Sequence, residues 1–158
     1  MKILCCLSFL FVFLNSVLAQ QPFSVSPIDI EHYEINVEIV PEESLLRGQV
    51  KTSFVMLEDS VSVPFEINSK LTLFEVTDEE GVQYSISFDD FNSTNLRIRG
   101  PKLFRQGEEK TFIFQFEGIL EREQHAFLDI RQNARAVIHR KGALLLSEGL
   151  WFPSHRLT

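Results

Sequence analysis

Apolar and polar residues alternate along most of this chain, which is typical of β-strands with one face in a core and one in water. The clearest case is the stretch 29–57, where apolar positions alternate over residues 33–39 and again over residues 46–56. A short polar connection, residues 41–44, separates the two runs. We therefore predict two long antiparallel strands here, with the rest of the chain covering their apolar face.

Shorter runs of the same period follow at intervals of about ten residues, separated by turn signals. We predict further strands over residues 61–67, 71–76, 82–88, 96–98, 112–116, 134–139 and 143–146. The turn signal Asp78-Glu79-Glu80-Gly81 predicts that 71–76 and 82–88 form a hairpin. The whole pattern predicts an all-β, mostly antiparallel fold, either a β-sandwich or a large curved sheet.

Three places break this regular pattern. Pro64 cannot donate a ladder hydrogen bond, so it predicts that its strand is an edge strand or carries a bulge. Gly118 predicts a bulge or a close approach of another backbone segment. Residues 121–132 are rich in charge and predict a helical turn or a long loop.

The composition agrees with a β core. Fifteen of the 158 residues are Phe, against two Tyr and one Trp, and 44% of the residues are hydrophobic. Aromatic residues favour strands, and this length suits one domain with a core of its own. The formal net charge of −7 argues against nucleic acid and anionic membranes as partners.

The first 19 residues have the organisation of a secretory signal peptide. Lys2 precedes an uncharged apolar run over residues 3–14, and Val17-Leu18-Ala19 offers a cleavage site. We interpret residues 20–27 as an extended lead-in and residues 28–158 as one β domain. The expected location is secreted, extracellular or periplasmic, with membrane contact only if the signal segment stays uncleaved. The only two cysteines lie within the signal, so the mature chain is expected to have no disulfide and no thiolate ligand.

Several motifs together resemble the N-terminal domain of the aminopeptidase N family of zinc metallopeptidases. They are HY-x-I-x-V, L-x-G-x-V, NSKLTLFEV with its DEEG turn, F-x-F-x-G and the closing W-F-P, in this order over residues 28–158. The resemblance implies a saddle-shaped, mostly antiparallel β domain that leans on a thermolysin-like catalytic domain and forms one wall of the active-site cavity. The family domain is longer, so we expect this chain to be incomplete at its C-terminus.

The zinc chemistry of that family is not encoded in this sequence. A zincin site needs H-E-x-x-H, which places two imidazoles one helical turn apart on the metal with a Glu as general base. None of the four histidines lies within four residues of another, and none begins this motif; they are His32, His125, His139 and His155. We predict a non-catalytic chain without a metal site or cofactor; zinc and the peptide substrate belong to the resembled full-length enzyme.

Two stretches supply candidate site residues. The resemblance implies that a Gln or Glu just before the W-F-P element helps to hold the free amine of the substrate, and Glu148 is the nearest position. The residues flanking it depart from the family pattern. Trp151, Phe152 and Pro153 are expected to pack at the domain border. Asn92-Ser93-Thr94 is a candidate glycosylation site, which matters only in a eukaryotic source.

Two hypotheses follow from these observations. In the first, the chain is a structural and interaction module: the leading β domain of a secreted aminopeptidase, whose partners are the catalytic domain of the same longer protein and its peptide substrate. In the second, it is a stand-alone secreted β-sandwich that binds a protein or a carbohydrate through its loops. The sequence leaves the organism, the oligomeric state and the substrate specificity open.

Overall fold

The computed structural model describes residues 26–89, 94–121 and 135–155. In these ranges the chain forms nine strands, which are β1 (Ile28–Val40), β2 (Leu45–Met56), β3 (Val63–Glu66), β4 (Leu71–Asp78), β5 (Ser85–Phe88), β6 (Asn95–Arg99), β7 (Glu109–Ile119), β8 (Ala136–His139) and β9 (Gly142–Leu145). Two short 3-10 helices, Pro41–Glu43 and Ser147–Gly149, complete the elements found there. The expected signal peptide, Asn92 and nearly all of residues 121–132 lie outside the described residues.

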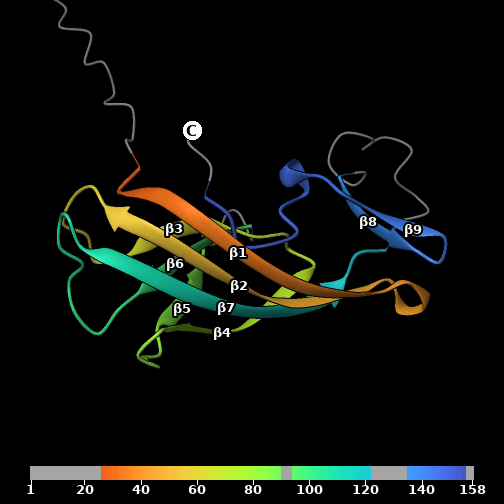
Figure 1. Cartoon of the computed structure of the whole chain (residues 1–158), viewed down its shortest axis with the longest axis horizontal. Helices are drawn as coiled ribbons and strands as arrows, with labels where there is room; N and C mark the ends of the chain where they lie inside the picture. The colour runs from red at the N-terminus through yellow and green to blue at the C-terminus, as the bar shows by residue number, and fades with distance from the viewer. Residues whose placement is uncertain (1–25, 90–93, 122–134, 156–158) are drawn as a thin grey trace, which may run out of the picture.

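The strands form one long sheet, one short sheet and a separate hairpin. The long sheet has the order β1-β2-β7-β4, the short sheet has the order β3-β6-β5, and β8 pairs with β9. All of these pairs are antiparallel, which confirms the predicted all-β, mostly antiparallel fold. Figure 1 shows the long sheet as a twisted ribbon with β3, β6 and β5 behind it. No helix within the described ranges is long and apolar enough to cross a membrane.

Phenylalanine side chains fill the space between the two sheets. Phe112 and Phe114 of β7 are fully buried, and their neighbours on the same face of β2 are buried as well. Phe65 of β3 reaches across from the short sheet, with its ring centroid 4.9 Å from that of Phe114. Phe54 of β2 lies at the same distance, 4.9 Å, from Phe112 in an edge-to-face arrangement. The run of alternating Phe residues therefore builds a sandwich core, as the pattern predicts.

Two glycines let backbone segments pack closely on this core face. A Cβ at Gly118 of β7 would overlap the carbonyl oxygen of Lys70, which confirms the predicted close approach. A Cβ at Gly48 of β2 would overlap the side chain of Val37 in β1. The two register shifts of this sheet lie elsewhere, between Ile30 and His32 of β1 and between Leu73 and Glu75 of β4. Pro64 lies in β3, which is an edge strand of the short sheet, as predicted.

Two expectations need correction. The predicted hairpin of residues 71–76 and 82–88 forms only next to its turn, where Thr77 bridges Gln83 and the main-chain N–H of Tyr84 donates to the carbonyl of Val76 at 2.9 Å. Its extension along the full strands is wrong, since β5 turns away from β4 and pairs with β6 in the short sheet. The predicted buried face of β1 is only partly covered: Ile35 is 38% exposed and Ile39 is 37% exposed. The reason is that β1 is an edge strand of the long sheet, and the short sheet packs mainly on β2 and β7.

Candidate functional site

The 3-10 helix Ser147–Gly149 holds Glu148 at the surface. Asn68 fixes this turn from the loop between β3 and β4, since its side-chain amide donates to the carbonyl of Gly149 at 2.8 Å. Its main-chain N–H donates to the carbonyl of Leu150, also at 2.8 Å. Glu148 itself is exposed, and no hydrogen bond or ion pair of its carboxylate is found within the described part of the chain. A cationic group could approach it from solvent; its predicted role in binding the substrate amine stays a prediction.

Residues 151–155, which we call the C-terminal strap, cross from the turn to the two sheets. Trp151 and Phe152 are half-buried and Pro153 is buried. The ring of Phe152 packs edge-on against Trp151 at 4.7 Å and against Tyr33 of β1 at 5.4 Å. Phe152 therefore covers β1 at Tyr33, within the described domain, and Trp151 packs against Phe152. Their predicted place at a border with another domain stays a prediction.

The end of the strap contacts three separate parts of the fold. Ser154 exchanges two main-chain hydrogen bonds with Glu66 of β3, with donor–acceptor distances of 2.7 and 2.9 Å. The main-chain N–H of His155 donates to the Tyr33 hydroxyl at 3.0 Å. The imidazole Nδ1 lies 3.1 Å from the carbonyl oxygen of Pro64, and Nε2 makes a short hydrogen bond with Ser26 Oγ. These contacts tie the strap to β1, to β3 and to the residues before β1.

Ser26 and His155 have the chemistry of a nucleophile and a base, but the local geometry gives Ser26 a structural role. Its hydroxyl also lies 2.8 Å from the carbonyl oxygen of Ile28 and accepts the main-chain N–H of Ile28 at 3.1 Å. These contacts close a serine turn at the start of β1 and occupy the oxygen that would have to attack. The pKa of Tyr33 is raised. Burial is the larger influence and raises it, while the hydrogen bond from His155 lowers it.

Beyond the strap, β1 presents apolar side chains that are only partly covered. Tyr33, Ile35, Val37 and Ile39 share one face, which we call the β1 apolar face, because each lies opposite a core-facing residue of β2. Phe152 covers this face at Tyr33. Ile35 and Ile39 remain 38% and 37% exposed. Such a row at a sheet edge is a surface suited to contact with another protein part.

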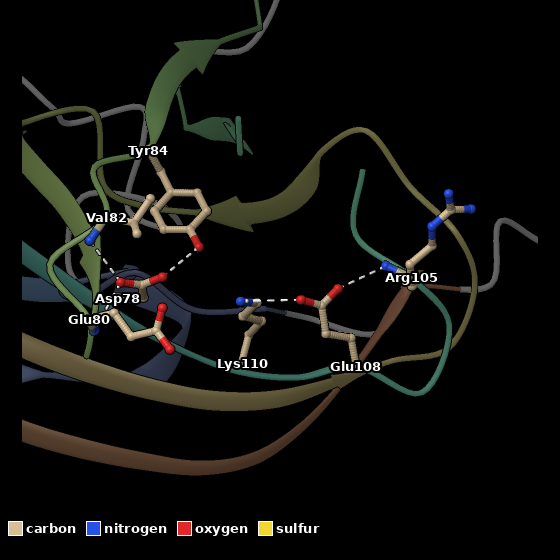
Figure 2. Close-up of polar contacts among 7 residues, drawn as sticks. All are labelled: Asp78, Glu80, Val82, Tyr84, Arg105, Glu108 and Lys110. Atoms are coloured by element: carbon tan, nitrogen blue, oxygen red, sulfur yellow. Dashed lines mark hydrogen bonds and ion pairs between the residues drawn. The ribbon is translucent and has the colours of Figure 1, made fainter. Parts of the chain in front are cut away.

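A buried carboxylate holds the corner where the chain passes from the long sheet to the short one. Figure 2 shows Asp78 accepting from the main-chain N–H groups of Glu80 and Val82, at 3.0 and 2.8 Å, and from the Tyr84 hydroxyl at 2.9 Å. Gly81 completes the turn with a φ of 80°, where a glycine is unstrained. The corner is thus a rigid structural element that directs β5 into the other sheet.

The hydrogen bonds at this corner set the ionisation of both side chains. Burial is the largest single influence on Asp78 and opposes its charge, but the donors from Val82, Tyr84 and Glu80 together outweigh it and lower its pKa. The pKa of the Tyr84 hydroxyl is raised, first by burial and then by its bond to the Asp78 carboxylate. The carboxylate is therefore engaged inside the fold and is not poised for acid–base chemistry.

Figure 2 also shows Glu108, which connects the turn at Arg105 to β7. Its carboxylate accepts the main-chain N–H of Arg105 at 2.9 Å and pairs with the ammonium of Lys110 at 3.2 Å (Figure 2). The hydrogen bond from Arg105 is the main reason that the pKa of Glu108 is lowered. A groove of about 380 Å³ lies between the Asp78 turn and the start of β7, with Glu31, Glu79, Glu80 and Lys110 in its lining. Within the described ranges, no three metal-ligating side chains are placed to hold an ion.

The structure separates the histidines that the sequence offers. His139 lies at the exposed tip of the β8–β9 hairpin, where its Nδ1 accepts the main-chain N–H of Lys141. His155 instead contacts β1 and β3. Sequence reasoning missed the contact of His155 with Ser26, because the two are 129 positions apart and no local pattern joins them. The only sequence signal for the site around His155 was the apolar–polar alternation over residues 33–39, which predicts that Tyr33 faces the core.

Comparison with solved structures finds this fold in M1 zinc metallopeptidases. A mutant enzyme from Deinococcus radiodurans, bound to a Tyr-Ser-Ala substrate, matches with a TM-score of 0.60 and 16% identity, over 83% of this chain and 30% of that one. A second mutant structure from that organism gives 0.61 and 15%, with the same coverage, and a further structure gives 0.52 and 18%, over 69% and 24%. Identities at this level show the fold alone.

The chain spans about 30% of the length of the first structures that it matches. No protein-family model matches the sequence, and no curated protein matches it.

Proposed function

We propose that this chain is the non-catalytic N-terminal β domain of a secreted zinc aminopeptidase-like protein. In this proposal it packs on the catalytic domain of the same longer protein and forms part of the wall along the peptide substrate. The observation that carries the proposal is the fold match to M1 zinc metallopeptidases, which covers most of this chain and only 30% of theirs. One of the matched enzymes holds a Tyr-Ser-Ala substrate, which supports a peptide as the ligand class.

The β1 apolar face is the surface that we assign to the catalytic domain. Ile35 and Ile39 lie on an edge strand and remain 38% and 37% exposed after the domain has folded. Exposure of such an apolar row to water is unfavourable. Its burial against a partner surface would therefore stabilise the contact between the two domains. On the substrate side, Glu148 supplies a solvent-facing carboxylate that suits an ammonium group.

The experiment begins with the gene beyond the codon for Thr158. An open frame that reaches H-E-x-x-H supports the proposal, and the longer protein can then be produced with Ile35 and Ile39 both replaced by Ser. We expect a small effect in the 158-residue chain but a lower melting temperature and lower peptidase activity in the longer protein.

Val61→Ser is the matched control, because Val61 is 65% exposed and lies outside this face. A stop codon after Thr158, reproduced in independent reads, would overturn the proposal in favour of a stand-alone β-sandwich binding module. Equal behaviour of the control and the double variant in the longer protein would reject the assigned surface alone.

A further inference from the structure

The long sheet has a second face, which points away from the short sheet and which we call the outer face (Figure 1). Side chains alternate along a strand, so the residues between the buried positions of β2 and β7 lie on it. One row of polar side chains crosses all four strands. Asn36 of β1 is paired with Gln49 of β2, and Gln115 of β7 lies between Gln49 and Glu75 of β4. These four residues form a band across the outer face, which we call the amide row.

A β-bulge brings an aromatic ring to this row. The pairing of β4 with β7 shifts between Leu73 and Glu75, so Phe74 is an extra residue between two paired positions. A bulge of this kind changes the direction in which a side chain points. Phe74 is 55% exposed, and it lines the same groove of about 370 Å³ as Gln49 and Gln115. The exposed ring is therefore a built feature of the outer face.

The charged side chains beside the amide row face partners of opposite sign. The Arg47 guanidinium contacts the Glu38 carboxylate at 2.8 Å, and Glu117 of β7 lies opposite Arg47. The Lys51 ammonium lies 3.8 Å from the Glu34 carboxylate. An anionic ligand would meet these carboxylates, and a cationic ligand would compete with Arg47 and Lys51 for them. The electrostatics of the outer face therefore favour a neutral ligand.

The place of the row in the middle of a sheet argues against a peptide as that ligand. β2 and β7 are each paired on both sides, so their main-chain groups are used in the two ladders. A peptide strand on this face would find no main-chain partner and would leave its own N–H and C=O groups to side chains. A ligand whose hydrogen-bonding groups lie on its own side groups has no such requirement.

A sugar chain meets these conditions. Each amide of Asn36, Gln49 and Gln115 has two N–H donors and an acceptor oxygen, which match neighbouring hydroxyl groups that both donate and accept. The Gln115 amide donates to Glu75 at 3.4 Å, which orients both side chains. The C–H groups on the flat side of a pyranose ring can pack on the ring face of Phe74. Because neighbouring strands lie about 4.8 Å apart, the row is about 14 Å long, which is enough for several sugar units.

We propose that the amide row and Phe74 form a binding surface for a neutral polysaccharide, whose chain lies across the strands with one sugar ring on Phe74. This inference goes beyond the proposed aminopeptidase role and does not depend on it. The two roles use opposite faces of β1, because Asn36 alternates with Ile35 and Val37 of the β1 apolar face.

Affinity electrophoresis of the purified chain tests the proposal. Each native gel contains one soluble neutral polymer: dextran, laminarin, mannan or arabinoxylan. We expect at least one of them to slow the chain, with binding about tenfold weaker in Phe74→Ala and about two- to tenfold weaker in Gln115→Leu. Phe88→Ala is the matched control and should bind as the wild type does, because Phe88 is 45% exposed but lies in β5 of the short sheet.

Two outcomes of the gels would overturn the proposal. One is that none of the four polymers slows the wild type, and the other is that Phe74→Ala and Phe88→Ala bind equally well. If Gln115→Leu does not fold, NMR of the wild type replaces it. The side-chain amide signals of Asn36, Gln49 and Gln115 must then shift together when an oligosaccharide of the binding polymer is added, and shifts confined to other residues reject the site.

Discussion

Replacing Asp78 by Ala tests whether one buried carboxylate fixes the corner between the sheets. The substitution removes the acceptor of three hydrogen bonds, of which the Tyr84 hydroxyl and the Val82 N–H are the ones with limited access to water. An orphaned buried donor costs about 1–3 kcal/mol, so we expect Asp78→Ala to lower the free energy of unfolding by about 3 kcal/mol. Glu80 is exposed, and its N–H can bind water instead.

A double-mutant cycle separates the hydroxyl bond from the rest of the corner. Tyr84→Phe removes the donor, so the combined variant has no orphaned hydroxyl and should lose less stability than the sum of the two single variants, by about 1–2 kcal/mol. Urea unfolding followed by Trp151 emission measures each midpoint, and an unchanged slope shows that stability alone has changed. Asp59→Ala is the matched control, because Asp59 also accepts two hydrogen bonds but is exposed.

The pH dependence gives a second check on the same residue. The folded-state pKa of Asp78 is lowered, so its stabilising effect is complete above the unfolded pKa of about 3.9 and is lost as the pH falls toward the folded value. The stability difference between the wild type and Asp78→Asn should therefore shrink on acidification in that range. A cost of Asp78→Ala no larger than that of Asp59→Ala would refute the reasoning about the corner.

Two further substitutions test the core. Gly118→Ala should lower the free energy of unfolding by about 1–3 kcal/mol, since the new methyl group meets the backbone of Lys70. The control Gly107→Ala, in open space with a φ of 78°, should cost about 1 kcal/mol. Thermal unfolding compares the two variants, and equal costs would count against the close approach at Gly118. Phe112→Ala should cost about 3–5 kcal/mol because Phe112 packs against Phe54 and Tyr84, whereas Phe74→Ala, at a residue 55% exposed, should cost far less in the same assay.

The strands could be predicted from the sequence because their signal is local. Alternation over residues 46–56 and 112–116 places the same side chains inward that the structure buries in β2 and β7. The predictions at Pro64 and Gly118 likewise depend on the residue alone, since Pro64 has no main-chain N–H to donate and Gly118 has no Cβ. Predictions that depended on one residue's own chemistry or on its nearest neighbours therefore agreed with the structure.

The pairing of strands depends on parts of the chain that no local pattern contains. The turn at Asp78 reverses the chain in the same way whether β5 then pairs with β4 or with a strand of the other sheet. What decides is β6, which pairs with Ser85–Phe88 in the short sheet, so that only the residues just after the turn stay against β4. Likewise, alternation in β1 identifies an apolar face but not whether another layer covers it. The Ser26–His155 contact is the extreme case, since it joins the two ends of the described chain.

The β1 apolar face and the C-terminal strap are two parts of one surface, which makes their exposure interdependent. Phe152 covers Tyr33, and the cover stops before Ile35. Replacing Phe152 by Ala would uncover Tyr33 and extend the exposed row along β1. This substitution should then increase the binding of an apolar dye by the isolated chain. In a longer protein whose catalytic domain covers this face, the increase should be smaller, because the contact that hides Ile35 would also hide part of the surface that the substitution uncovers.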